Sequence, residues 1–465
     1  RKICFERLVF MNRKVMMKYK DNILKDIAAL VSIPSVAGPP APNAPYGEPC
    51  ARALNFLLNR AKELQFDTRN IDNAAGHAQY GSGVEIAAVL THVDVVGAGE
   101  GWSTDPFSAT LIGRRLYGRG VADDKGAAVA ALYCLKAIKD LGIRGKRRLR
   151  VIWGSAEETG MKDMSVYFSN QPLPSLAFSP DSEYGICNRE KGILHLKIKN
   201  PSPIGNVEFH AGRALNTVAD RAYMSIPCSE EEYQKLFASS AKGAVEITAE
   251  KQPEGVLLHA RGRSEHAMDA PKGLNAATYL LQTVAESIDI SWFDPLILFL
   301  HQAIGVQTNG ENLTIQCVDE PSGELTVNVG LVEIDSENSS ISLDIRYPVT
   351  IQGKDIIEKI RTAASGYGLE CELIEDLPPL YLPEYNEINK ILRLAYKNAT
   401  GQSVNFYSTG GGTYARTLNG KGVAFGPLFH PGSYHNLHGA NEFIDIDEFM
   451  LHCEICLEAM IQMMG

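Results

Sequence analysis

The chain has 465 residues, which at roughly 150 residues per domain allows two to three domains and excludes a lone small module. Hydrophobic residues make up 45% and charged residues 22%, a balance that excludes a mainly disordered chain and a multi-span membrane protein. The net charge is −10 and no long lysine or arginine block occurs, so we expect a small molecule or a short peptide as partner, with no nucleic acid and no membrane.

Nine cysteines, an odd number spread along the chain, argue against a disulfide framework and predict reduced thiols in a cytoplasmic protein. Cys453 and Cys456 form one Cys-x-x-Cys pair inside a helical pattern. We interpret this pair as helix packing, because a zinc ribbon would need a second pair. Residues 1–10 are basic and partly apolar, but their apolar core is too short for a secretory signal, so we interpret them as an extension upstream of Met11.

The first part of the chain alternates between helical and strand patterns. Apolar residues at helical spacing predict helices over 21–33, 51–66 and 126–141. Short apolar runs predict buried strands over 84–90 and 149–153. This alternation is typical of an α/β fold with a mostly parallel sheet, in which functional groups collect at the carboxyl ends of the strands.

The pattern changes after residue 188 and returns near residue 381. The middle part combines period-two segments with helices, which indicates an α+β fold, over residues 193–199, 275–288, 341–346 and 354–366. The α/β pattern returns with a helix over 387–397, a strand over 422–425 and a helix over 446–463. We therefore predict a catalytic domain made of residues 1–188 and 381–465, with an α+β domain of residues 189–380 inserted between its two parts.

Five polar motifs follow one another, four of them near expected strand ends. They are His92-Val93-Asp94, Gly118-Arg119-Gly120-Val121-Ala122-Asp123-Asp124-Lys125-Gly126, Glu157-Glu158-Thr159-Gly160, Pro180-Asp181 and His438-Gly439-Ala440-Asn441-Glu442. Each alone has an ordinary alternative: a packed histidine, a carboxylate cap on the following helix, or a solvated acidic loop. Together they supply two histidines and several carboxylates, a mixed nitrogen and oxygen set that suits zinc or a similar divalent ion, with enough ligands for two.

This succession resembles the M20 family of co-catalytic dizinc metallopeptidases, and within it the PepV-type bacterial dipeptidases. The resemblance runs from about residue 21 to the C-terminus. It implies that Asp123 bridges two Zn²⁺ ions per chain, with His92 and Asp181 completing one site and Glu158 and His438 the other. It also implies that Asp94 orients His92 and that Glu157 is the general base for a water activated by the two metal ions.

Two ligand positions have a neighbouring competitor, and the metal has alternatives. The family spacing Gly-Arg-Gly-x-x-Asp-x-Lys-Gly selects Asp123 over Asp124, and the following Asn441-Glu442 favours His438 over His435. Mn²⁺ or Co²⁺ would suit the same ligand set.

The resemblance extends to the inserted domain, which it implies is a mobile lid. Residues Gly262–Ala276 match a family segment whose histidine, here His266, reaches into the active site, and Asn216 and Arg346 match positions that contact substrate. A turn before the next helix would explain the glycines and Pro271, and a surface hydrogen-bonding role is the alternative for Asn216 and Arg346. The turn containing Gly411, Gly412 and Thr413 resembles the family's substrate-binding glycine turn, where glycine permits close approach of the backbone.

Arg346 and the size of the insert guide the functional prediction. The planar guanidinium can bind a carboxylate through two hydrogen bonds, which favours hydrolysis of dipeptides with a free C-terminus. The insert resembles the enlarged lids of chains that work as monomers. The alternatives are another M20 amidohydrolase, such as an N-acyl-amino-acid deacylase or a succinyl-diaminopimelate desuccinylase, and a non-catalytic metal- or peptide-binding protein on the same scaffold.

Overall fold

The computed structural model describes residues 15–240 and 243–465 and divides the chain into two compact units. The first unit comprises the chain up to Asn188 together with Tyr381–Tyr407 and Gly412–Gly465; the second comprises Arg189–Leu380 and Ser408–Gly411. The extension predicted over residues 1–10 lies outside the described residues.

A nine-stranded sheet forms the centre of the first unit. Its order is β1-β2-β6-β3-β7-β22-β9-β20, with β21 paired to β9. The strands span Asp67–Ile71 (β1), Ala75–Tyr80 (β2), Arg148–Gly154 (β6), Ile86–His92 (β3), Leu176–Ser179 (β7), Gly422–Phe425 (β22), Ile186–Glu190 (β9), Leu380–Tyr381 (β20) and Phe406–Thr409 (β21). The central strands β6, β3, β7 and β22 are parallel, whereas β1, β2 and β9 pair antiparallel, so the predicted α/β fold is confirmed with antiparallel margins.

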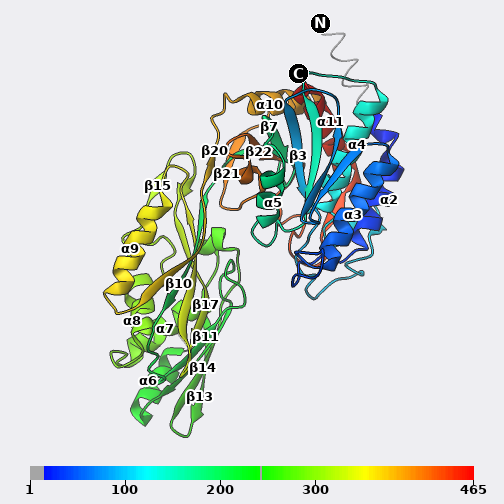
Figure 1. The fold of residues 1–465 in the computed structure, drawn as a ribbon. Helices are drawn as coiled ribbons and strands as arrows, with labels where there is room; N and C mark the ends of the chain where they lie inside the picture. Colours follow the sequence, from blue (N-terminus) through cyan, green and yellow to red (C-terminus); the bar gives the residue numbers. More distant parts are fainter. Residues whose placement is uncertain (1–14, 241–242) are drawn as a thin grey trace. The chain divides into compact units, whose positions relative to one another are not determined.

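Helices cover both faces of this sheet (Figure 1). One face carries α4 (Lys125–Asp140) and α11 (Ile446–Met463), with α2 (Lys20–Val31) and α10 (Glu387–Thr400) packed against them. The other face carries α5 (Lys162–Asn170) and the short helix η3 (Tyr414–Leu418), while α3 (Glu48–Glu63) packs against β1 and β2. The sequence predicted five of these helices, and each begins and ends within three residues of its predicted bounds: α2, α3, α4, α10 and α11.

The Cys-x-x-Cys pair packs one helix against another. Cys453 and Cys456 are both buried in α11, and the thiol of Cys134 in α4 donates to the carbonyl oxygen of Cys453 at 3.3 Å. The interpretation of this pair as helix packing is therefore confirmed. The eight cysteines in the described residues are free.

The parallel strands bring the sequence motifs to one edge of the sheet. β3 ends at His92, which lies in register with Gly154 at the end of β6, and β7 ends at Ser179, just before Asp181. Helix α4 begins at Lys125, immediately after Asp123 and Asp124. The carboxyl ends of β3, β6 and β7 therefore gather the first four motifs at the edge where open α/β sheets hold their functional groups.

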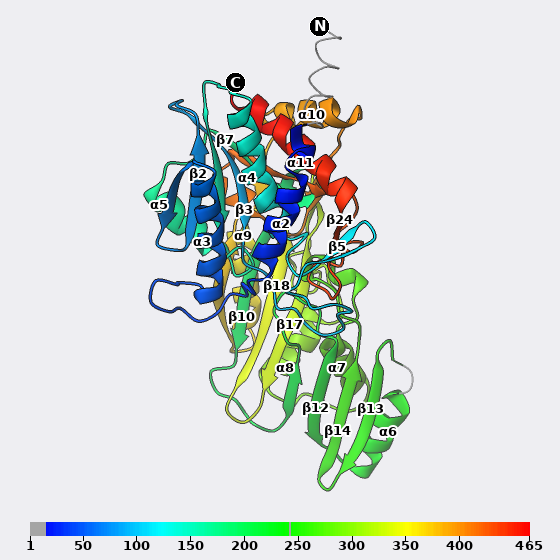
Figure 2. The same cartoon turned by 90° about the vertical axis from the view of Figure 1, so that its right-hand side faces the viewer.

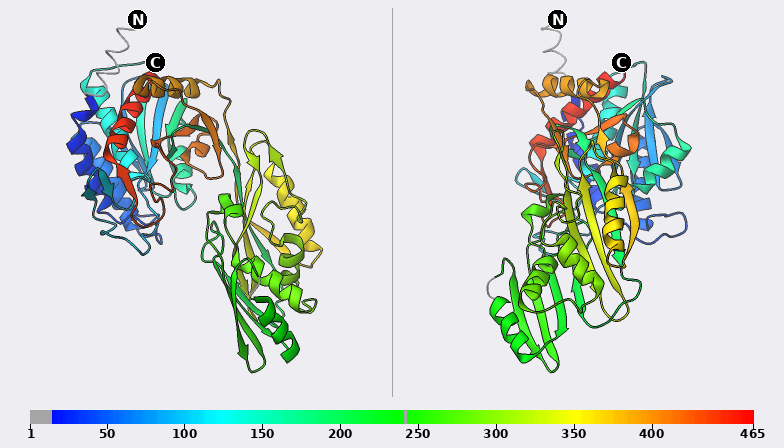
Figure 3. Two further views of the ribbon diagram at one scale, coloured as in Figure 1. Left: turned by 180° about the vertical axis from the view of Figure 1, so that it is seen from behind. Right: turned by 90° about the vertical axis from the view of Figure 1, so that its left-hand side faces the viewer.

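The second unit is an antiparallel sheet covered by helices on one face (Figure 2 and Figure 3). The eight strands, in sheet order, are β13 (Glu246–Gln252), β14 (Gly255–Arg261), β12 (Arg221–Pro227), β11 (Glu208–Ala211), β17 (Thr326–Ile334), β18 (Ser339–Tyr347), β10 (Gly192–Lys199) and β19 (Glu370–Leu377). Helices α6 (Glu230–Ser240) and α7 (Ala276–Ser287) pack on one half of the sheet, and α9 (Gly353–Ser365) packs on β10 and β19. The predicted α+β character of this part is thus confirmed.

Short elements complete the two units. They are β4 (Thr110–Ile112), β5 (Arg115–Tyr117) and β24 (Phe443–Asp445) in one small sheet, β8 (Ser182–Glu183) with β23 (Pro427–Leu428), β15 (Val318–Asp319) with β16 (Gly323–Glu324), and the helices η1 (Ala267–Lys272), α8 (Pro295–Phe299) and η2 (Leu300–Ile304). Across residues 15–240 and 243–465, no helix combines the length and the apolar composition needed to cross a bilayer.

Candidate metal centre

Two clusters of potential metal ligands share Asp123. One contains His92, Asp123 and Asp181, and the other contains Asp123, Glu158 and His438; within each cluster the ligand atoms lie within 4.8 Å of one another. Asp123 Oδ1 lies 3.0 Å from His92 Nε2, and Asp123 Oδ2 lies 3.0 Å from His438 Nε2. The Asp123 carboxylate therefore presents one oxygen to each cluster, as a bridging ligand must.

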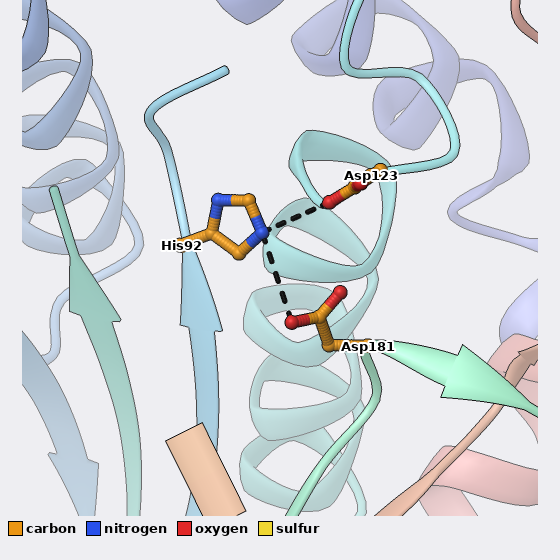
Figure 4. Close-up of side chains that lie close together, drawn as sticks. All are labelled: His92, Asp123 and Asp181. Atoms are coloured by element: carbon orange, nitrogen blue, oxygen red, sulfur yellow. Dashed lines mark hydrogen bonds and ion pairs between the residues drawn. The ribbon is translucent and has the colours of Figure 1, made fainter. Parts of the chain in front are cut away.

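The separations within the clusters suit a small divalent cation. His92 Nε2 lies 3.8 Å from Asp181 Oδ2, and both carboxylates face the same ring nitrogen (Figure 4). His438 Nε2 lies 3.3 Å from Glu158 Oε1. In a tetrahedral site with metal–ligand bonds of about 2.0–2.2 Å, ligand atoms are about 3.3–3.6 Å apart, so these residues fit a pair of such ions.

The electrostatics of the two clusters also favour a bound cation. Burial would lower the pKa of His92, but hydrogen bonds with Asp123, Asp181 and Asp94 raise it well above its usual value. Burial raises the pKa of Asp181 to about 7, and burial together with the charge of Asp123 raises the pKa of Glu158. Several carboxylates crowd into a buried space here, and a bound cation would relieve their mutual repulsion.

Asp94 contacts loop 155–158 as well as His92. Nδ1 of His92 lies 2.9 Å from the main-chain oxygen of Asp94 and 3.5 Å from its carboxylate. The carboxylate itself accepts hydrogen bonds from the backbone N–H groups of Glu157 at 3.2 Å and Glu158 at 3.0 Å. The main-chain oxygen is thus the nearer partner of the ring. With its proton on Nδ1 and directed at this oxygen, the neutral ring would offer its Nε2 lone pair to a metal ion held between His92, Asp123 and Asp181.

Glu157 has the features of a proton acceptor. It is 9% exposed, and among the described residues its Oε1 atom has no hydrogen-bond partner. Burial, followed by the negative charge of Asp181, raises the pKa of Glu157 well above its usual value. A buried carboxylate with an uncommitted oxygen, next in the chain to Glu158 of the second cluster, is suited to move a proton at this centre.

The structure separates the competing ligand candidates. Asp124 accepts a hydrogen bond from the His92 backbone N–H at 3.3 Å and makes no side-chain cap on α4, so the alternative of a carboxylate cap is wrong for Asp124. His435 is buried with its Nδ1 atom 3.1 Å from the Phe443 carbonyl oxygen. Asp123 and His438, rather than these two neighbours, supply the atoms that face each other.

Glu442 is a buried residue whose role the motifs did not reveal. Its carboxylate pairs with Arg119 at 2.7 Å and accepts hydrogen bonds from the backbone N–H groups of Gly120, Ala122 and Asp123 at 2.9–3.2 Å. It therefore fixes the loop that carries Asp123. The sequence signal was an acid four residues after His438 and an arginine between two glycines, but neither pattern shows that they meet.

In the second unit, the structure brings the predicted substrate residues Asn216 and His266 together. Ala267 N–H donates to the Asn216 carbonyl oxygen at 2.9 Å, and Thr217 pairs with His266 in a β-bridge. Nδ1 of His266 accepts a hydrogen bond from Met268 N–H at 3.1 Å. The neutral ring therefore carries its proton on Nε2, which makes that atom a hydrogen-bond donor.

Arg346 is buried and largely engaged. Two of its nitrogens donate to the Asp344 carboxylate at 2.6 and 2.7 Å, and a third donates to the Gly410 carbonyl oxygen at 2.9 Å. These bonds use three of the five N–H groups of a guanidinium, so an incoming carboxylate would use the remaining ones. Asp344 also forms a hydrogen bond with His195. Burial would lower the pKa of His195, but its hydrogen bonds with Asp344 and Glu375 raise that pKa to about 9.

The glycine turn is closely packed. Gly411 N–H donates to the Thr409 hydroxyl at 3.0 Å, and the Thr413 hydroxyl accepts from Ala415 N–H at the start of η3. A Cβ atom at Gly412 would come within 2.7 Å of the Arg416 guanidinium, so a side chain here would require that guanidinium to shift.

Comparison with known proteins agrees with this geometry. The sequence matches the model of peptidase family M20/M25/M40 over residues 88–462. It is 33% identical to "Putative dipeptidase YtjP" of Bacillus subtilis (strain 168), over 96% of this chain and 98% of the relative. The fold is similar to that of the M20 family metallo-carboxypeptidase Sso-CP2 from Sulfolobus solfataricus, with a TM-score of 0.60, 15% identity and coverage of 95% and 99% of the two chains.

Human carnosine dipeptidase 1 shares the fold as well, with a TM-score of 0.58, 12% identity and coverage of 98% of this chain and 99% of that one. These two structural likenesses concern the fold alone, because both identities are low. The family match, in contrast, spans most of the sequence, and a relative more than 30% identical covers nearly all of it. The chain therefore belongs to the M20 family of peptidases.

Proposed function

We propose that this M20 peptidase is a metal-dependent dipeptidase that cleaves short peptides with a free C-terminus. The observation that carries the proposal is the Asp123 carboxylate, which faces His92 and His438 with one oxygen each, beside the buried Glu157. The name of the Bacillus subtilis relative supports dipeptides as the substrate class.

Five residues would hold the metal ions: His92, Asp123, Asp181, Glu158 and His438. A pair of divalent cations there would lower the pKa of a water between them to about 7 and polarise the scissile carbonyl. Zn²⁺ suits this nitrogen and oxygen set, as would Mn²⁺ or Co²⁺. Glu157 takes the proton of the attacking water and delivers it to the leaving amine, which is why a carboxylate with an unpartnered oxygen is needed at this position.

The second unit supplies the residues that recognise the substrate, and we propose that it acts as a lid. The Nε2–H group of His266 donates a hydrogen bond to the developing oxyanion, an interaction commonly worth about 3–4 kcal/mol. Arg346 binds the substrate carboxylate through the N–H groups that Asp344 and Gly410 leave available. Asn216 and the turn of Gly411, Gly412 and Thr413 bind the peptide backbone of the substrate.

The central test compares Glu157→Gln with Glu63→Gln, the same chemical change at an exposed carboxylate on α3. Glu157→Gln should reduce dipeptide turnover about 10²- to 10⁴-fold, to a small residual rate, while the bound metal, measured by elemental analysis, stays at the level of the unmodified protein. Glu63→Gln should leave both unchanged. If Glu157→Gln leaves turnover intact, the proposed mechanism is wrong. A protein that binds dipeptides and hydrolyses none would instead be a binding module.

A substrate panel separates the dipeptidase from its nearest rivals. Unblocked dipeptides, N-acyl amino acids and N-succinyl-diaminopimelate are assayed with and without a chelator. Hydrolysis confined to the dipeptides, and lost with chelator, is the expected result. Exclusive hydrolysis of an N-acyl compound would assign the chain to the amidohydrolases of the family.

We further propose that the chain works as a monomer. Its second unit has helices on both halves of one eight-stranded sheet, so two α+β halves already lie side by side within a single chain. Light scattering coupled to size exclusion should give a mass near 50.8 kDa. An obligate dimer would contradict this proposal.

A further inference from the structure

The loop that carries Glu157 and Glu158 is held by two buried carboxylates. The backbone N–H groups of Ser155 and Ala156 donate to Asp163 at 2.7 and 2.9 Å. Those of Glu157 and Glu158 donate to Asp94 at 3.2 and 3.0 Å. Four consecutive amides of loop 155–158 therefore end on two aspartates that are each 0% exposed.

Asp163 links this loop to a second part of the site. Its other oxygen accepts from Met164 N–H at 2.8 Å, and the oxygen that faces the loop also accepts from the Tyr414 hydroxyl. Tyr414 is fully buried, directly follows Thr413 and lies edge-on to the His92 ring, with 6.2 Å between the ring centres. One hydrogen-bonded pair thus contacts the base-bearing loop, the ring of a metal ligand and the glycine turn.

The surroundings of Asp163 explain why these contacts are specific. A buried carboxylate is costly unless hydrogen bonds compensate it, and among the described residues the groups that favour the charged form of Asp163 are hydrogen-bond donors rather than a lysine or arginine. The loop amides and the Tyr414 hydroxyl are therefore its main source of compensation. The last residue of β6 is Gly154, where any side chain would collide with the Tyr414 hydroxyl and the Asp163 carboxylate. Glycine at this position admits the pair.

We propose that Asp163 and Tyr414 are positioning residues for peptide hydrolysis. They act through the backbone of loop 155–158 and, together with Asp94, fix the direction in which Glu157 leaves that backbone, whereas the Glu158 N–H is held by Asp94. This inference rests on the proposed function, because it assigns Asp163 an effect on the proton transfer by Glu157. It implies that kcat depends on Asp163 and Tyr414, although neither residue would contact the substrate or a metal ion.

The test replaces Asp163 by asparagine, which keeps the size of the side chain and places an NH₂ group against N–H or O–H donors. Dipeptide kcat should fall about 10- to 100-fold, the loss expected when a reacting group is misplaced by a fraction of an ångström to one ångström. KM should stay within about threefold, because the substrate contacts are unchanged. Metal content should equal that of the unmodified protein. Tyr414→Phe, which removes one hydrogen bond, should lower kcat less than Asp163→Asn does.

Asp294→Asn is the matched control. Asp294 is also a buried aspartate (1% exposed) that accepts backbone N–H groups, from Leu296 and Ile204, but it lies in the second unit. The substitution should reduce thermal stability and leave kcat unchanged. If Asp163→Asn lowers kcat no more than Asp294→Asn does, the positioning role is refuted. If Asp163→Asn fails to fold, Tyr414→Phe decides, and an unchanged kcat in that variant refutes the role.

A double substitution separates positioning from general destabilisation. If Asp163 acts through Glu157, adding Asp163→Asn to Glu157→Gln should not lower the residual hydrolysis any further. A loss of the same factor in both backgrounds would show that Asp163 acts independently of the base and would overturn the inference. The proposed function fails in a different experiment, namely when Glu157→Gln alone leaves turnover unchanged.

Discussion

The strongest structural prediction concerns Glu442, whose carboxylate joins the C-terminal segment to the loop that carries Asp123. Arg119 is 1% exposed and Glu442 is 0% exposed, and they form an ion pair at 2.7 Å. The same carboxylate accepts the N–H groups of Gly120, Ala122 and Asp123. Glu442→Gln keeps the shape of the side chain. However, its new NH₂ group must face either the guanidinium or the loop amides, which are all donors.

The expected cost follows from this burial. Removing one partner of a buried ion pair leaves the other charge uncompensated, and such changes cost about 3–5 kcal/mol. The free energy of unfolding of the first unit can be followed by urea titration with tryptophan fluorescence in a Trp292→Phe background. Trp102 and Trp153 then report on that unit, and Trp102 lies against the Arg119 guanidinium, with 5.4 Å to the ring centre.

Glu63→Gln serves as the control, because the Glu63 side chain is 64% exposed in its pair with Arg60. An exposed pair contributes about 0–1 kcal/mol, so this variant should unfold near the midpoint of the unmodified protein. If Glu442→Gln costs less than about 1 kcal/mol, no more than an exposed pair, the carboxylate does not hold the loop and the reasoning is refuted.

Three further predictions concern the metal ions, acid stability and substrate charge. Removing the metal ions with a chelator should lower the melting temperature, and added Zn²⁺ should restore it. The reason is that a ligand at a hundredfold excess over its Kd stabilises the folded protein by about 2.7 kcal/mol. An unchanged melting curve would contradict the two-cation site. Burial and the charge of Arg150 lower the pKa of His77 to about 3, so only the unfolded chain binds this proton between about pH 6.5 and 3, and stability should fall as the pH drops through that window. His77→Gln should weaken this pH dependence in urea titrations at pH 7 and pH 5, and an unchanged slope would refute the assignment. Arg346→Lys should raise KM for free dipeptides at least about tenfold, because the bidentate contact with the substrate carboxylate is lost. KM for C-terminally amidated dipeptides should change little. An equal change for both substrates would refute carboxylate recognition.

The elements that the sequence predicted correctly are those with strong local patterns. The alanine-rich helix α4 and the apolar strand β3 form close to their predicted ends, because burial on nearly all sides leaves an unbroken apolar signal. The candidate metal ligands come together for a related reason. Parallel strands end at a common edge, so motifs that follow β3, β6 and β7 must meet there whatever the length of chain between them.

What the sequence did not reveal are the contacts between side chains and distant backbone amides. Glu442 and Asp163 look like ordinary acidic residues in the chain, since a carboxylate that accepts an N–H group needs no particular spacing from it. Asp94 was expected to orient His92 through its carboxylate, yet the nearer partner of the ring is the main-chain oxygen of Asp94. Likewise, the Arg346 guanidinium was expected to bind the substrate carboxylate. Asp344, two residues away in the chain, already accepts hydrogen bonds from two of its nitrogens.

These overlooked contacts share one physical device. Loops at the edge of a parallel sheet have no neighbouring strand to satisfy their amides, and here buried carboxylates take that place: Asp94 and Asp163 for loop 155–158, and Glu442 for the loop that ends at Asp123. Every such carboxylate adds negative charge behind a site that already crowds Asp123, Asp181 and Glu158 together. Of these three carboxylates, only that of Glu442 forms an ion pair with an arginine of the described residues. The same arrangement therefore holds the loops in place and concentrates negative charge at the site, so the proposed cation binding and the proposed orientation of Glu157 would have one structural cause.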